Sequence, residues 1–152
     1  MNVLKDFPRK AYGEDALRLS NEITYFQDGI FPEAGELIAL FFPSSRPVEG
    51  ANASIFLTRG AGERESFSLT VTSQGARISA PDADGCRHAL ACLSLAAYFC
   101  RGEWRIPAME ETSAPCDAHR GIMLDLARGI RPLEKLKEDL ILIAKARLNT
   151  VH

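Results

Sequence analysis

The first two-thirds of the chain alternate apolar with polar residues in short stretches, which is the pattern of β-strands buried on one face. The clearest stretch is 66–72, where phenylalanine, leucine and valine alternate with serine and threonine. Weaker stretches of the same kind occupy four further ranges: 16–20, 22–26, 54–58 and 76–80. The first two are separated by little more than Asn21, so we expect one bent strand or a tight pair there.

Glycine-containing segments separate these strands. We interpret Arg59-Gly60-Ala61-Gly62 as the turn of a hairpin between 54–58 and 66–72, and Ser73-Gln74-Gly75 as a second turn that leads into 76–80. The glycines of the first turn lie between two strands and do not open a helix, which argues against a phosphate-binding loop. The alternation and the turns together predict a mainly antiparallel sheet.

Two helices are predicted in the same part of the chain. The segment 32–42 begins with proline and carries leucine, isoleucine and phenylalanine along one side, as expected of a short amphipathic helix. Asp82 is a suitable N-cap for a longer helix that runs to about Cys100 and is ended by Gly102. Residues 16–105 therefore predict an α+β fold, in which a small, mainly antiparallel sheet is covered by two helices.

Residues 117–152 have a different pattern. The segment 121–124 is continuously apolar, which is typical of a strand buried on both faces. After a polar loop, Pro132 begins a helix with an apolar stripe, and 149–152 look like the start of another strand. This order of strand, loop, helix and strand predicts one βα unit and the first step of a second, as at the start of a (β/α)8 barrel.

A single parallel βα unit leaves its strand without neighbours and the apolar face of its helix without a sheet to cover. A complete barrel of such units takes about 250 residues. We therefore expect this chain to be the truncated start of a longer protein. Alone, the segment from about 117 would be mobile or buried in a homo-oligomer contact. The alternative is that the helix folds back onto the N-terminal sheet and completes a small domain.

Composition and charge exclude several functions. The 152 residues are 46% hydrophobic and 25% charged, with a net charge of −2, as in an ordinary globular protein. There is no run of lysine or arginine, so nucleic acids and anionic membranes are not expected partners. The longest apolar run, 89–100, is too short to span a bilayer. No secretory signal is visible, which favours the cytoplasm, although secretion stays open if residues precede Met1.

The four cysteines are Cys86, Cys92, Cys100 and Cys116, and their spacing fits neither a zinc site nor a CxxC motif. Three of them fall on the longer predicted helix, where cysteine is usually a small buried residue. We therefore expect core thiols in a reducing compartment, and no metal site.

A family resemblance rests on two motifs in the last part of the chain. The first is His119-Arg120-Gly121-Ile122-Met123-Leu124-Asp125-Leu126-Ala127-Arg128, and the second is Lys145-Ala146-Arg147-Leu148-Asn149-Thr150-Val151-His152. With the helix between them, they resemble the start of the catalytic barrel of family 20 glycoside hydrolases, which reads Arg-Gly-apolar-x-apolar-Asp-x-x-Arg, a helix, then Lys-x-Asn-x-x-His. Upstream, Ile106-Pro107-Ala108 and Pro115 are similar to an Ile-Pro-Ala and a proline of that family.

The resemblance implies a β-N-acetylhexosaminidase, which hydrolyses terminal β-linked N-acetylglucosamine or N-acetylgalactosamine with assistance from the substrate's own acetamido group. It implies a non-catalytic α+β domain over 1–115 and the start of the catalytic TIM barrel over 116–152. The catalytic Asp-Glu pair of the family lies beyond the second strand. This chain is therefore expected to contain no catalytic residue and to be inactive alone, and the family implies no cofactor and no metal.

The resemblance also assigns site residues. It implies that Arg120 binds substrate, because the matching arginine of the family lies at the barrel mouth and hydrogen-bonds sugar hydroxyls, for which a guanidinium fork is suited. The alternative for Arg120 is a structural ion pair near the start of a strand. Asp125 and Arg128 follow the strand at a spacing that permits a mutual salt bridge supporting the site. His152 is expected near the active site without acting as acid or base.

Other residues carry less chemistry. We expect His88 to be a satisfied core or surface histidine, and the adjacent Glu110 and Glu111 do not face each other as a catalytic pair must. Two further hypotheses fit the same sequence. One is a free-standing α+β module that binds carbohydrate or protein without catalysis, and the other is a truncated relic without function.

Overall fold

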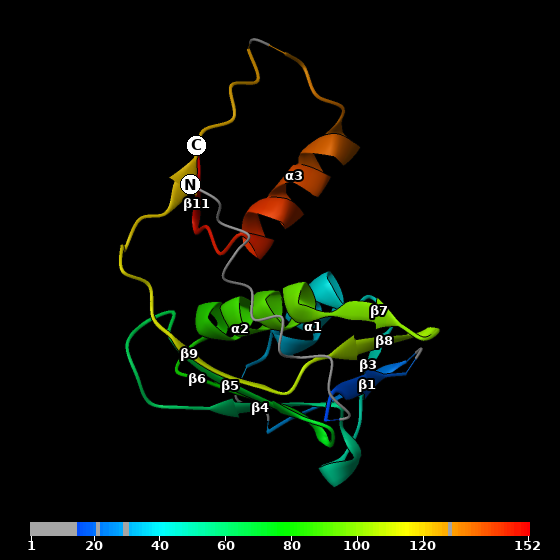
Figure 1. Ribbon diagram of the computed structural model, residues 1–152. Coiled ribbons are helices and arrows are strands. Elements are labelled where there is room, and N and C mark those ends of the chain that lie inside the picture. Colours follow the sequence, from blue (N-terminus) through cyan, green and yellow to red (C-terminus); the bar gives the residue numbers. More distant parts are fainter. Residues whose placement is uncertain (1–14, 21, 29–30, 128) are drawn as a thin grey trace, which may run out of the picture.

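The computed structural model describes residues 15–20, 22–28, 31–127 and 129–152 (Figure 1). Its main layer is a six-stranded sheet, and two helices, α1 (Ala34–Phe41) and α2 (Ala83–Ala96), lie together on one face of it. In spatial order the strands are β3 (Ser45–Pro47), β2 (Ile23–Gln27), β4 (Ile55–Arg59), β6 (Gly75–Ala80), β5 (Phe67–Thr72) and β9 (Met109–Ser113). The predicted α+β layer is confirmed, but strands β3 and β9 were not predicted.

The sheet is mixed, so the prediction of a mainly antiparallel sheet is wrong. Strand β2 runs parallel to β3 and to β4, and β4 runs parallel to β6. Only β5 pairs antiparallel, with β6 and with β9. The connection from β2 to β3 runs through α1, which is the kind of crossover that parallel neighbours need.

The hairpin predicted between 54–58 and 66–72 is also wrong. Strand β4 pairs with β6, not with β5, and Leu57 lies opposite Ile78. The short turn at 73–75 joins β5 to β6 as predicted, and this local hairpin fills one edge of β6. The other edge is then free for β4, so the segment 60–66 passes over the end of β6 and does not form a tight turn.

A second, three-stranded sheet has the order β1 (Leu17–Leu19), β8 (Glu103–Ile106) and β7 (Tyr98–Cys100). Strands β1 and β2 thus belong to different sheets and form neither a bent strand nor a pair. Helix α2 ends at Ala96, before the predicted end, and Cys100 lies on β7. Arg101 and Gly102, with φ of 53° and 86°, make the turn between β7 and β8.

The core lies between the six-stranded sheet and the two helices. The alternation predicted for 66–72 is confirmed, because Phe67, Leu69 and Val71 are buried. Each fully buried side chain of this size contributes roughly 1.5–3 kcal/mol to stability. The predicted N-cap is confirmed too, since Oδ1 of Asp82 accepts a hydrogen bond of 2.7 Å from the backbone N–H of Gly85.

Beyond the sheets, β10 (Gly121–Ile122), α3 (Leu133–Lys145) and β11 (Thr150–Val151) form a strand–helix–strand unit. The two strands are parallel, with Gly121 opposite Thr150, as the sequence pattern predicts. Helix α3 packs against α2 and not against the six-stranded sheet, so it does not complete that sheet as the alternative required. That this unit starts a barrel stays a prediction. None of the helices among the described residues is long and apolar enough to cross a membrane.

Candidate functional site

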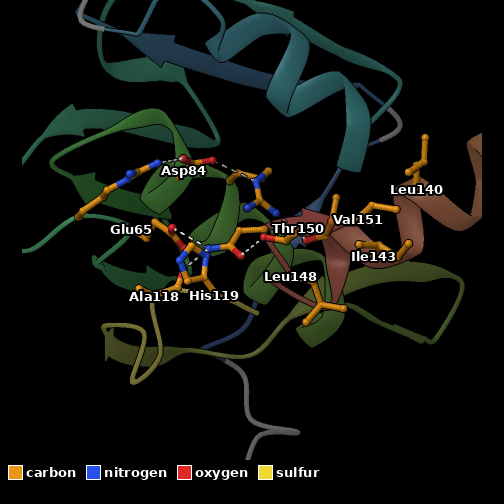
Figure 2. Close-up of a pocket in the computed structure, with 13 residues that line it drawn as sticks. Glu65, Asp84, Ala118, His119, Leu140, Ile143, Leu148, Thr150 and Val151 are labelled. Atoms are coloured by element: carbon orange, nitrogen blue, oxygen red, sulfur yellow. Dashed lines mark hydrogen bonds and ion pairs between the residues drawn. The ribbon is translucent and has the colours of Figure 1, made fainter. Parts of the chain in front are cut away.

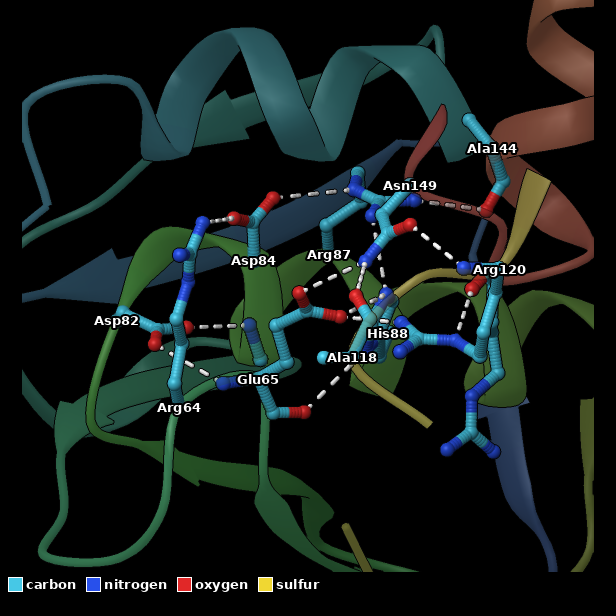
Figure 3. Close-up of polar contacts among 12 residues, drawn as sticks. Arg64, Glu65, Asp82, Asp84, Arg87, His88, Ala118, Arg120, Ala144 and Asn149 are labelled. Carbon is cyan, nitrogen blue, oxygen red and sulfur yellow. Dashed lines mark hydrogen bonds and ion pairs between the residues drawn. The ribbon is translucent and has the colours of Figure 1, made fainter. Parts of the chain in front are cut away.

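A buried glutamate lies where the sheet layer meets the β10–α3–β11 unit. Glu65, just before β5, is only 4% exposed and has a left-handed backbone with φ of 63°. Its N–H donates to Oδ2 of Asp82 over 2.9 Å, and its carbonyl oxygen lies 3.3 Å from Nδ1 of His88 (Figure 3). A non-glycine residue adopts this conformation at a cost, so contacts on both sides are needed to hold it.

The carboxylate of Glu65 faces two side chains from residues 117–152, which we call the later segment. Oε2 forms an ion pair with Nη2 of Arg120, and Oε1 accepts a hydrogen bond of 3.0 Å from Nδ2 of Asn149 (Figure 3). The two partners are also bonded to each other, because the N–H of Arg120 donates to Oδ1 of Asn149 over 3.0 Å. Arg120 precedes β10 and Asn149 precedes β11. One carboxylate therefore joins the starts of both parallel strands.

Two further donors of Arg120 are also engaged by the protein. Nη1 donates to the carbonyl of Asp117 over 2.6 Å, and Nε donates to the carbonyl of Arg147 over 3.2 Å. The side chain of Arg120 is 17% exposed. Three N–H groups of the guanidinium are thus used inside the protein, and the ion pair with Glu65 is a structural role of the kind that is the alternative to sugar binding. Sugar binding by Arg120 stays a prediction.

Burial and charge act in opposite directions on Glu65. Burial alone would raise the pKa of its carboxyl, but hydrogen bonds from Arg120 and Asn149, with the charges of Arg120 and His88, hold the pKa below its ordinary value. For His88, burial and the charge of Arg87 lower the pKa of the imidazole. The folded protein thus favours the deprotonated form of both groups, and His88, only 1% exposed, lies in the core as one of its expected positions.

Two further arginines join the sheet layer to the later segment. Arg87 of α2 donates from Nη1 to the carbonyl of Ala144 in α3 over 3.0 Å. Arg147, after α3, donates from Nη2 to Oγ of Ser113 over 2.7 Å, and its guanidinium lies 5.2 Å from the ring centroid of Phe67. The junction is therefore built mainly from arginines that bind backbone carbonyls and polar side chains, as in other polar interfaces within a chain.

A pocket of about 430 Å³ opens beside this junction (Figure 2). Its walls differ in character. Arg64, Asp84 and Arg87 form a charged side, while Leu140, Ile143 and Leu148 form an apolar side. Within the described ranges, no group of histidine, cysteine, aspartate and glutamate could hold a metal ion. The pocket lies between the two parts of the chain.

The structure separates the predicted site residues into two places. Arg120 lies at the N-terminal edge of the β10–β11 pair, whereas Asp125 and His152 follow the strands at the C-terminal edge, where the N–H of Leu124 donates to the carbonyl of His152 over 2.8 Å. Active sites of complete parallel β/α barrels form at the C-terminal edge, and that Arg120 lies at a barrel mouth stays a prediction. Arg128 and its expected salt bridge lie outside the described residues.

Sequence reasoning missed Glu65 as the central residue of the junction. Its only local signal is an acidic side chain in a glycine-containing segment between two strands, and such residues are usually exposed. Asn149 lay within the second motif but received no role. Neither residue could be recognised alone, because the role of each depends on its hydrogen bond to the other, and the two are 84 positions apart in the chain.

The comparisons with known proteins agree on the fold. No protein-family model matches this chain. Among solved structures it is similar to a β-N-acetylhexosaminidase from Bacteroides fragilis, with 22% identity and a TM-score of 0.77 over 93% of this chain. It is similar also to a family 20 exo-β-N-acetylglucosaminidase from Vibrio harveyi in complex with N-acetylglucosamine, with 18% identity and a TM-score of 0.78 over 92% of this chain.

A third structure, a family 20 β-N-acetylglucosaminidase, has 25% identity and a TM-score of 0.71 over 94% of this chain. The resemblance inferred from the two motifs is thus confirmed at the level of the fold. The chain is much shorter than these enzymes, since it covers 30%, 23% and 28% of their respective lengths.

Proposed function

We propose that these residues form the N-terminal part of a glycoside hydrolase that removes terminal β-linked N-acetylhexosamine. Residues 1–115 would be its non-catalytic α+β domain, and 116–152 would be the first strand, helix and second strand of its catalytic barrel. The observation that carries the proposal is the agreement in fold with solved β-N-acetylhexosaminidases across almost the whole chain. The position of the Arg-Gly motif at the start of a parallel strand supports it.

The reaction proposed is substrate-assisted hydrolysis. The acetamido oxygen of the sugar attacks the anomeric carbon while an acid protonates the leaving oxygen, and water then opens the cyclic intermediate. The acid and the residue that orients the acetamido group would be a Glu and an Asp beyond the second strand. No residue of this chain is assigned to that chemistry, and no step requires a cofactor.

Within this chain, sugar recognition is proposed for the C-terminal edge of β10–β11. Asp125 is exposed there, and its Oδ1 accepts a hydrogen bond of 3.0 Å from the N–H of Ala127, which shapes the loop after β10. His152 is exposed at the same edge. Arg128 belongs to the same loop by its place in the sequence. Arg120 could reach a sugar only with donors that the junction does not use.

Many large apolar side chains of the later segment are exposed, which supports the proposal that further polypeptide covers them in the complete protein. Large apolar side chains remain exposed on both strands, on α3 and in the loop between them, more than an isolated surface usually shows in one region. They are Ile122, Met123, Leu126, Ile130, Leu133, Leu140, Leu142 and Val151. In the proposed enzyme, the remaining barrel would cover this surface. In the competing proposal, a second copy of the chain would cover it.

The coding sequence after the codon for His152 is the first test, because the proposal requires an Asp-Glu pair there. The second is an assay of the complete gene product with a chromogenic N-acetylglucosaminide. Arg120→Ala should be compared with Arg46→Ala, a control in which an exposed arginine loses an exposed ion pair with Glu22. A rise in KM at unchanged stability would assign Arg120 to sugar binding, and a loss of stability would assign it to the junction.

Absence of hydrolysis by the complete gene product would remove the enzyme proposal. A free-standing module that binds carbohydrate or protein would then be favoured if the 152-residue chain bound a chito-oligosaccharide in calorimetry. Sedimentation of the same chain at increasing concentration tests the homo-oligomer, since a shift to twice the monomer mass would indicate that a second copy covers the apolar surface.

A further inference from the structure

The left-handed backbone of Glu65 is bound by groups of the sheet domain, the part of the chain that carries the two sheets with α1 and α2. Asp82, the N-cap of α2, binds the N–H of Glu65, and His88 of the same helix approaches its carbonyl oxygen. Asp82 also accepts from Gly85, so a single carboxylate fixes both the helix start and the glutamate backbone. The side chain of Glu65 therefore leaves the sheet domain from a rigid base, with little freedom to follow its partners.

All the strong donors to this side chain come from the other part of the chain. Arg120 and Asn149 bind different oxygens of the carboxylate, and Asn149 also donates to the carbonyl of Ala118 over 2.8 Å. The N–H of Asn149 in turn donates to the carbonyl of Arg120 over 2.8 Å. The carboxylate, the guanidinium and the amide thus form one closed set of bonds at the N-terminal edge of β10–β11.

We propose that Glu65 is a positioning residue, whose carboxylate sets the place of β10 and β11 relative to the sheet domain. Because the two strands are short and paired in parallel, fixing their starts also fixes their opposite ends, where Asp125 and His152 lie. The non-catalytic domain would thereby control the geometry of the edge proposed for sugar recognition. This consequence for sugar binding rests on the proposed function, whereas the control of strand position does not.

Charge makes this role selective for glutamate. A buried carboxylate without its cation is strongly disfavoured, so the sheet domain holds the later segment only when Arg120 is in place. Glutamine at 65 keeps the shape and one hydrogen bond but loses the ion pair with Arg120. Glu63 offers a matched control, because it is an exposed glutamate two residues earlier in the same segment.

Hydrogen exchange of the 152-residue chain tests the proposal. In Glu65→Gln we expect the amides of Leu124, Thr150 and His152, which are bonded between the strands, to exchange at least about tenfold faster, while amides of β5 and β6 keep their protection. Glu63→Gln should change neither set. Unchanged exchange at β10 and β11 in Glu65→Gln would overturn the proposal.

If Glu65→Gln loses protection throughout, the variant has failed to fold, and Arg120→Lys makes the same test from the later segment. Lysine keeps the charge but cannot bind both the carboxylate and the carbonyls of Asp117 and Arg147. Faster exchange confined to β10 and β11 is expected, and protection equal to that of the unmodified chain would overturn the proposal.

The complete gene product supplies a readout that general loss of stability does not move. At a temperature where both proteins are folded, Glu65→Gln should raise KM for the chromogenic N-acetylglucosaminide about tenfold with a smaller change in kcat. An unchanged KM would overturn the link to sugar binding and leave the exchange result standing. If even the unmodified product is inactive, the proposed function fails, and hydrogen exchange alone decides the role of Glu65.

Discussion

Arg87 donates a hydrogen bond of 3.0 Å to the carbonyl of Ala144, so that an arginine of α2 binds the C-terminal end of α3. This carbonyl also accepts from the N–H of Arg147 over 3.1 Å, so Arg87 supplies a second donor at the negative end of the helix dipole. The side chain of Arg87 is only 12% exposed, which protects the interaction from water. The contact therefore stabilises both α3 itself and its packing on α2.

Replacing Arg87 with methionine should lower the free energy of unfolding by about 1–2 kcal/mol, because the hydrogen bond to Ala144 and the contact of 2.9 Å with Nε2 of His88 are lost while much of the apolar stem is kept. Urea unfolding followed by circular dichroism measures the change. Arg64→Met is the control: Arg64 is 81% exposed and its ion pair with Asp84 is long, at 3.8 Å, so a change below about 0.5 kcal/mol is expected. Equal effects of the two variants would contradict the role given to Arg87.

Gly85 should not tolerate a side chain. A Cβ atom there would lie 2.1 Å from the carbonyl oxygen of Ser66 and 3.2 Å from Cβ of Ala80, so α2 would have to move away from β5. We expect Gly85→Ala to lower the free energy of unfolding by roughly 2–3 kcal/mol, despite the better helix propensity of alanine. Differential scanning calorimetry measures the effect. Gly129→Ala is the control: no atom lies within 4 Å of the added Cβ, so its melting temperature should be almost unchanged.

Stability should fall on acidification, beginning near neutral pH. The folded-state pKa of His88 is lowered by burial and by the charge of Arg87, while the carbonyl and the carboxylate of Glu65 act in the opposite direction. The unfolded chain therefore binds a proton at His88 more readily than the folded chain does. The stability associated with this group is complete above the ordinary pKa of 6.5 and is lost as pH falls below it.

Glu65 acts in the same direction at lower pH. Its folded-state pKa is held below the ordinary value of 4.5, so its contribution is present above that value and is lost as pH falls through the folded pKa. Urea unfolding at several pH values from neutral downward measures both effects. His88→Gln should flatten the dependence around pH 6 while keeping the decline below about pH 4.5. An unaltered slope near pH 6 would show that His88 does not carry it.

The cysteines should differ sharply in reactivity. Burial raises the pKa of the Cys86 thiol to about 12, and this residue is completely buried, whereas Cys116 is exposed. Because the thiolate is the reactive species, a maleimide should label Cys116 within minutes and Cys86 only after denaturant is added. Mass spectrometry of peptides from native and unfolded protein checks the order. Rapid native labelling of Cys86 would indicate that α2 opens readily.

Much of the local structure could be predicted from neighbouring residues. The alternation in 66–72, the turn at 73–75 and the N-cap at Asp82 depend on contacts within a few positions, and the structure confirms all three. The sequence predicts none of the four short strands 45–47, 98–100, 103–106 and 109–113. The predicted helix extends over 98–100, because apolar density alone does not distinguish the end of a helix from a short strand.

The candidate site was predictable only in part. The motif around Arg120 correctly predicted a parallel strand–helix–strand unit. It contains a continuous apolar run, which is typical of the strands of parallel sheets. The motif could not indicate that Arg120 and His152 lie at opposite edges of the strands, or that Asp117 and Arg147 supply carbonyls to the guanidinium. These relations depend on how two distant segments are folded onto each other.

The sequence by itself determined part of the helices and strands of this protein, and the direction of its last two strands, because periodicity, turns and caps act over a few residues. Only the tertiary structure decided that β4 pairs with β6, and that the carboxylate of Glu65 meets Arg120, 55 positions later in the chain. Which strands pair, and which charged groups meet, depends on all the strands and charged groups that are brought together in the folded chain. A short stretch of sequence contains only a few of these.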